Sequence, residues 1–159
     1  MPKVKVKENT EENDVKQIAQ AIERGVLGPH YKVSVERGEN EYKDRYVLSL
    51  KDPADNQKEY HLAHLFPKKN ETTGESYYVA HVFPNVIIAA YAFGGTHPIS
   101  EHPPVTDVSL LYDLTYDIVK GIKLFLHNFE IAYLEIGNPE KPFRLLLYKG
   151  DFPEGAENL

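Results

Sequence analysis

The change in hydrophobic period along the chain constrains its fold more than any other feature. Up to Gly25, apolar side chains such as Val15, Ile18 and Ile22 recur at helical spacing, whereas further along they mostly alternate with polar ones. Alternation is typical of strands that bury one face. Short turns between such strands make an antiparallel meander. We therefore expect five strands, at residues 31–36, 46–50, 59–66, 76–83 and 86–93.

Two helices and two further strands complete the predicted order. Asn9 and Glu12 have the spacing of a capping box, which predicts a short helix that ends at Gly25. A long helix is predicted from Thr106 to about Asn128, because its apolar side chains cover one broad arc. Residues 1–159 are thus expected to form a single α+β domain with a curved antiparallel sheet on one long and one short helix. The last two strands are expected at 131–136 and 143–148, and flexible tails at 1–8 and 150–159.

Composition and charge exclude several classes of function. The chain has 159 residues, a net charge of −6 and no cysteine, so disulfides, thiolate nucleophiles and cysteine-based metal centres are excluded. An acidic chain is a poor candidate for binding nucleic acid, and we expect none. No apolar run approaches the roughly 20 residues that cross a membrane. We therefore expect a cytoplasmic protein with no membrane contact.

The distribution of charge is uneven. Between Lys69 and Lys120 there is no Lys or Arg, although the segment contains six acidic residues. Buried strands and a packed helix leave little room for unpaired cations, which explains most of this gap. We also expect a pocket or a partner surface in this region.

One predicted row of side chains is the leading candidate for a ligand site. If the short turns fix the register, four adjacent strands place Tyr46, His64, Tyr78 and Tyr91 side by side on an apolar face. An imidazole among phenols can bind a flat or polar ligand, or act in acid–base chemistry. The simpler alternative is a core histidine that bonds to a tyrosine hydroxyl. A slip of one residue would move these side chains to opposite faces.

The other face of the same register is predicted to place two histidines together. His61 and His81 lie across an antiparallel pair, in a row with Ser49 and Ile88, but two imidazoles are too few for a metal site. His61 and His64 are predicted to point to opposite faces of their strand, so they cannot chelate one ion. We predict no metal and no cofactor.

A proline-rich loop and the long helix carry the remaining candidates. His97, Glu101 and His102 gather in the loop before the long helix, where a polar connector is the favoured interpretation over a His/carboxylate site. Asp113 and Asp117 lie one helical turn apart, and with Lys120 nearby we expect a solvated face.

Three functions remain open at this point. The favoured one is a non-catalytic module that binds a small molecule or a protein partner through a Tyr/His-lined surface, as a homodimer. Both sheet faces are largely apolar and the chain has eleven Tyr and no Trp, which suits an interface or an aromatic pocket. The alternatives are a small hydrolase or isomerase that uses His and Tyr as acid and base, and an acidic inhibitor or immunity-type protein that blocks a basic surface.

Overall fold

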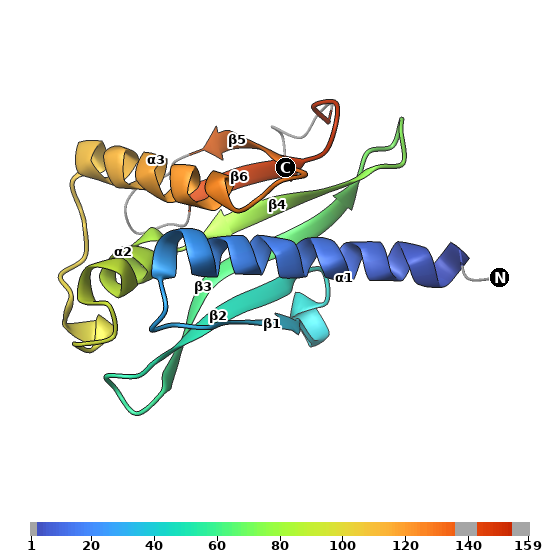
Figure 1. The fold of residues 1–159 in the computed structure, drawn as a ribbon. Helices are drawn as coiled ribbons and strands as arrows, with labels where there is room; N and C mark the ends of the chain where they lie inside the picture. Colours follow the sequence, from blue (N-terminus) through green and yellow to red (C-terminus); the bar gives the residue numbers. More distant parts are fainter. Residues whose placement is uncertain (1–2, 136–142, 154–159) are drawn as a thin grey trace.

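The protein is described by a computed structural model that covers residues 3–135 and 143–153 (Figure 1). The described residues form three α-helices and six strands. The helices are α1 (Lys3–Ile22), which continues as a π-helical turn over Glu23–Leu27, α2 (Pro84–Phe93) and α3 (Val108–Leu124). The strands are β1 (Val33–Arg37), β2 (Tyr46–Asp52), β3 (Lys58–Lys69), β4 (Ser76–Val82), β5 (Glu130–Glu135) and β6 (Phe143–Tyr148).

All six strands form one antiparallel sheet in the order β1-β2-β3-β4-β6-β5. The first four strands are neighbours in sequence and in space, as a meander requires. The hairpin of β5 and β6 then adds to β4 through β6. The predicted α+β class with an antiparallel sheet is confirmed, whereas the turn expected between the last two strands lies outside the described residues.

The predicted fifth strand, residues 86–93, is wrong: this segment is the helix α2. Pro84 lies in its first turn, where its missing N–H is no loss, and Gly94 ends it with a φ of 55° and an N–H bond to Ala90 O. The segment is apolar on all sides, so its pattern cannot distinguish a buried helix from a buried strand. The sheet therefore has a four-strand meander, not five strands, before the last hairpin.

The two predicted helices are present, but their bounds differ. The helix α1 begins at Lys3, so residues 3–8, expected in a flexible tail, are helical and Asn9 is no cap. The helix α3 is capped by Asp107, not Thr106: the Asp107 carboxylate accepts a bond from the N–H of Leu110 at 3.0 Å. In the other predicted tail, the described part includes Phe152, whose ring lies 5.3 Å from that of Tyr148.

The sheet register differs from the predicted one, by one residue where β2 begins to pair with β3 and by three residues between β3 and β4. Tyr46 is opposite Leu65 and not His64, which instead pairs with Val47 on one side and His81 on the other. A β-bulge also interrupts the pairing of β2 and β3: Leu48 faces Ala63, whereas the next residue, Ser49, faces His61. Leu62 is the additional residue.

The two faces of the sheet have different surroundings. The helix α1 lies across one of them, here called the helix-covered face (Figure 1). Its side chains join those of all three helices in the main core. The opposite, outer face has a separate small cluster that contains no helix residue: Tyr77, Val79 and Leu146, flanked by Phe66, Ala132 and Tyr148.

Candidate functional site

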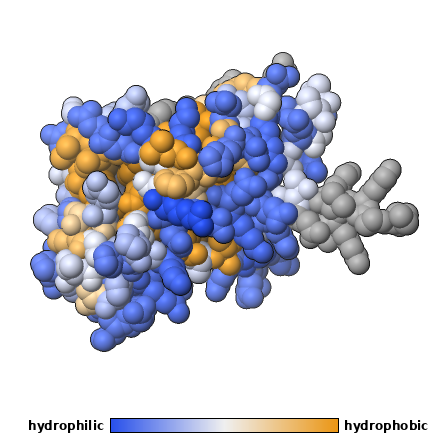
Figure 2. Space-filling model, in the orientation of Figure 1, coloured by the Kyte–Doolittle hydropathy of each residue, from blue (hydrophilic) through white to orange (hydrophobic). Residues whose placement is uncertain are grey.

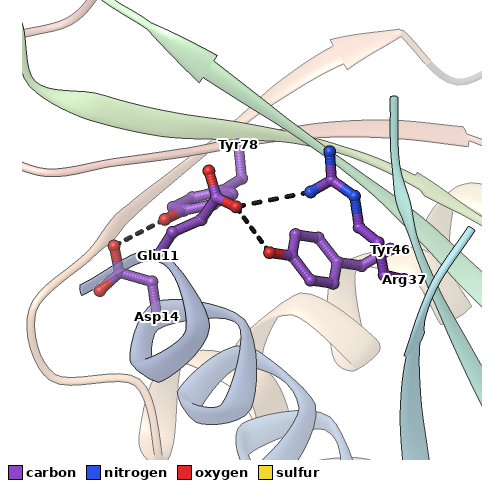
Figure 3. A network of polar contacts seen from close by, with 5 residues as sticks. All are labelled: Glu11, Asp14, Arg37, Tyr46 and Tyr78. Carbon is purple, nitrogen blue, oxygen red and sulfur yellow. Dashed lines mark hydrogen bonds and ion pairs between the residues drawn. The ribbon is translucent and has the colours of Figure 1, made fainter. Parts of the chain in front are cut away.

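Tyr46 and Tyr78 lie on the helix-covered face and bond to carboxylates of α1 (Figure 3). The Tyr46 hydroxyl donates to Glu11 at 2.6 Å, and Arg37 contacts the same Glu11 oxygen at 3.4 Å. The Tyr78 hydroxyl donates to Asp14 at 2.7 Å. Both phenols therefore have acceptors within the protein, and their arrangement holds α1 on the sheet.

Asp14 is almost fully buried, at 3% exposure, and its charge is matched by Lys149. The Lys149 ammonium lies 2.8 and 3.0 Å from the two carboxylate oxygens, and 5.1 Å from the centre of the Phe129 ring. Burial, and then the bond to Asp14, raise the pKa of Tyr78 far above its ordinary value. The Tyr78 hydroxyl therefore stays a donor at every physiological pH.

Sequence reasoning missed this network, and a signal for it was present. Because α1 begins at Lys3, Glu11 and Asp14 lie in the middle of the helix and not at its cap. Asp14 lies next to Val15 and four residues before Ile18, both buried, so it occupies the buried arc of α1. A carboxylate on an apolar arc requires partners, and Tyr78 and Lys149 supply them.

His64 lies on the opposite side of the sheet from these tyrosines, so the predicted row of Tyr46, His64, Tyr78 and Tyr91 does not form. The one-residue difference in register places His64 on the outer face. Tyr91 is on α2 and 73% exposed.

Three histidines gather on the outer face, in an arrangement that was not predicted. The bulge at Leu62 places His61 and His64 on the same face, with ring centres 5.7 Å apart, so the prediction of opposite faces is wrong. His81 pairs with His64 in the next strand, and not with His61 as predicted. The predicted pairing of His61 with Ser49 is confirmed, whereas Ile88 is on α2.

A hollow of about 450 Å³ opens beside His61 and His64 on the outer face. Its volume is within the range of about 300–1,000 Å³ that is typical of small-ligand sites. Three carboxylates line it together with the two imidazoles, one phenol and one hydroxyl. We call it the His-lined hollow: Glu36, Arg37, Gly38, Glu39, Tyr42, Val47, Ser49, Glu59, His61 and His64.

The contacts of His64 define its hydrogen-bonding state. Arg45 Nη1 lies 3.4 Å from His64 Nδ1, and because a guanidinium only donates, this contact requires an Nδ1 without a proton. Burial, and then the charge of Arg45, lower the pKa of His64, which favours the neutral form of the ring. A neutral ring with a free Nδ1 has its proton on Nε2. That Nε2 is buried, and no described residue accepts a bond from it.

The loop candidates pack on one aromatic ring. His97 and His102 lie 5.3 and 5.2 Å from the ring of Phe93, and His102 Nδ1 also contacts Pro103 O at 2.8 Å. Glu101 is exposed. Across residues 3–135 and 143–153, no group of three or more His, Asp or Glu side chains is arranged to hold a metal ion.

Tyr91 belongs to a second hollow, between α2 and α3, with a volume of about 230 Å³. Figure 2 shows hydrophobic surface in this region, between the two helices. Aliphatic side chains dominate its lining, and Asp117 supplies a carboxylate that also contacts Lys120 at 3.4 Å. The complete lining is Gly25, Val26, Ile87, Ile88, Tyr91, Leu114, Asp117 and Ile118.

Comparison with known proteins assigns no function: no family model, no curated protein and no solved structure matches the chain. Among the described residues, none of the helices has the length and apolar character that crossing a membrane requires.

Proposed function

We propose that the protein is a non-catalytic binding module and that its small-molecule ligand occupies the His-lined hollow. One observation carries this proposal: the buried Nε2 of His64 lacks an acceptor, although His64 lines an open hollow of about 450 Å³. A buried donor without a partner costs about 1–3 kcal/mol. A ligand that accepts this bond, after a small rotation of the ring, recovers that free energy.

The remaining lining indicates the chemistry of the ligand. Glu36, Glu39 and Glu59 surround the hollow, and Arg37 is the one permanent cation in its lining. Because Arg37 already contacts Glu11 and lies over the Tyr46 ring, the local charge favours a cationic group. The expected ligand is therefore a small organic amine that also carries a hydrogen-bond acceptor.

A titration with small amines that also carry hydroxyl groups, followed by two-dimensional NMR, tests this proposal. We expect the amines to shift the amide signals of Val47, Ser49 and His61, and we expect uncharged alcohols of the same size to have little effect. Ser49→Leu should fill the hollow and abolish the shifts. Its matched control is Ser34→Leu, because Ser34 faces Ser49 across the strand pair but is outside the lining.

Two results would contradict the proposal. Amines that shift signals elsewhere but not in the hollow would place the ligand site elsewhere. Unchanged amine binding by Ser49→Leu, with the thermal stability of that variant intact, would show that the hollow is not the site.

The other functions considered for the chain stay predictions. An inhibitor of a basic protein would use exposed acids such as Asp113 and Asp117, which lie on the solvent side of α3. A hydrolase or isomerase would use a histidine and a tyrosine as acid and base, but His64 lies on the opposite face of the sheet from Tyr46 and Tyr78. We keep the cytoplasmic location and the homodimer as predictions, and light scattering that shows only particles of one-chain mass would exclude the dimer.

A further inference from the structure

The outer face of the sheet carries a group of cations beside the three histidines. Along one row of the sheet, Val47, His64, His81 and Arg144 are successive neighbours across four strands. Next to this row, the Arg45 guanidinium lies 4.6 Å from the centre of the Phe66 ring, and His81 packs on the same ring at 4.6 Å. We call this group the basic strip: Arg45, His64, Lys68, His81 and Arg144.

The surroundings of the basic strip lower the pKa of both its imidazoles. Burial, and then Arg144, Arg45 and Lys68, lower the pKa of His81. Burial, and then Arg45, His61 and His81, lower the pKa of His64, whereas Asp44 raises it. The nearby cations disfavour a positive charge on either ring, because like charges repel each other. An anion bound among these groups would be attracted by every cation, and its negative charge would favour protonation of both rings.

Arg45 is already oriented, which lowers the cost of binding. Its side chain bonds to Asp44 at 3.0 Å and lies 4.7 and 4.6 Å from the ring centres of Tyr42 and Phe66. A side chain held in this way loses little further entropy when a ligand arrives. Guanidinium groups in fixed positions are well suited to phosphate oxygens.

We propose that the basic strip is a second binding site, which takes a doubly charged tetrahedral anion of the phosphate or sulfate type. The site is separate from the His-lined hollow, apart from the His64 ring that borders both, and does not require that the hollow bind anything. Several cations around one place favour a divalent anion over a carboxylate. The protein as a whole has a net charge of −6, so attraction of an anion must be local to this strip.

NMR titration of the histidine side chains tests the proposal, with sodium sulfate as the probe and sodium chloride at equal ionic strength as the reference. Sulfate keeps its double charge across the pH range of the titration. We expect sulfate to raise the pKa of His64 and His81 by at least about 0.5, because the anion stabilises each protonated ring. His127, exposed beyond the end of α3, serves as the internal control. Acetate should bind more weakly than sulfate.

Two neighbouring lysines provide matched variants. Lys68 is in direct electrostatic range of His81, whereas Lys69 follows it on the strand and therefore points to the other side. Lys68→Glu should weaken sulfate binding by about tenfold. Lys69→Glu makes the same change in net charge and should alter binding by less than about twofold.

Three results would overturn the proposal. The pKa values of His64 and His81 could move no more than that of His127, which would show that no anion binds between them. The two lysine variants could weaken sulfate equally, which would reduce the effect to general attraction. Acetate could bind as tightly as sulfate, which would exclude a site built for a divalent anion.

Discussion

Removal of the buried carboxylate of Asp14 should destabilise the protein strongly. Asp14→Ala leaves the hydroxyl of Tyr78, which has 0% exposure, without its acceptor. A buried hydroxyl without a partner costs about 1–3 kcal/mol. Lys149 also loses its partner, but its side chain is 32% exposed and can turn toward water, so we assign about 1 kcal/mol to it. The free energy of unfolding should therefore fall by about 3 kcal/mol.

Urea unfolding followed by circular dichroism measures this loss. With a slope of about 2 kcal/mol per molar urea, the midpoint of Asp14→Ala should fall by about 1.5 M. Asp113→Ala, which removes an exposed carboxylate on α3, is the control and should cost less than about 0.5 kcal/mol. Tyr78→Phe should cost about 1 kcal/mol, since the carboxylate then keeps Lys149.

The double variant separates the pair interaction from other effects. Once Asp14 is absent, the Tyr78 hydroxyl has no acceptor to lose, so Asp14→Ala with Tyr78→Phe should cost about 1–2 kcal/mol less than the sum of the single changes. Unfolding of Asp14→Ala at the same urea concentration as Asp113→Ala would contradict a stabilising role of the buried carboxylate. Additive costs of the two single changes would contradict the interaction between Asp14 and Tyr78.

Two further predictions concern pH and helix packing. The pKa values of His64 and His81 are lowered on folding, so the unfolded chain binds protons first and stability should fall as the pH drops below about 6.5. The double variant His64→Gln with His81→Gln should flatten the dependence of the free energy of unfolding on pH, measured by urea titration. An unchanged dependence on pH would contradict the prediction. A Cβ at Gly25 would overlap Gly121 O, where the π-helical turn after α1 crosses α3. Gly25→Ala should therefore cost about 2 kcal/mol or more, and a melting temperature equal to that of the wild type would contradict this close crossing.

The sequence allows the class of fold to be predicted because periodicity and turn residues act locally. Alternation around Leu48 and Leu50 correctly predicts a strand. The helical spacing of Val15, Ile18 and Ile22 correctly predicts the helix α1. The failure at residues 86–93 has a local cause too. An apolar run without a polar side fits either a helix or a strand, and Pro84 with Gly94 was the signal for a helix.

The candidate site could not be predicted, because it depends on register. A difference of one residue between β2 and β3 separates His64 from Tyr46 by the thickness of the sheet. The bulge at Leu62 then unites His61 and His64, whose spacing of three residues would otherwise place them on opposite faces. No turn residue or charge pattern indicates such a bulge, which forms where packing of the whole sheet requires it.

The state of His64 in the ligand-free protein decides whether a hydrogen-bond donor is available to a ligand, because the proposed site requires a neutral ring on the outer face with its proton on Nε2. Long-range ¹H–¹⁵N spectra of the imidazole at pH 7 report both charge and tautomer. We predict a neutral ring, a protonated Nε2 and a nuclear Overhauser contact with the His61 ring, whose centre lies 5.7 Å away. A charged His64, a proton on Nδ1, or a contact with Tyr78 instead of His61 would contradict the account.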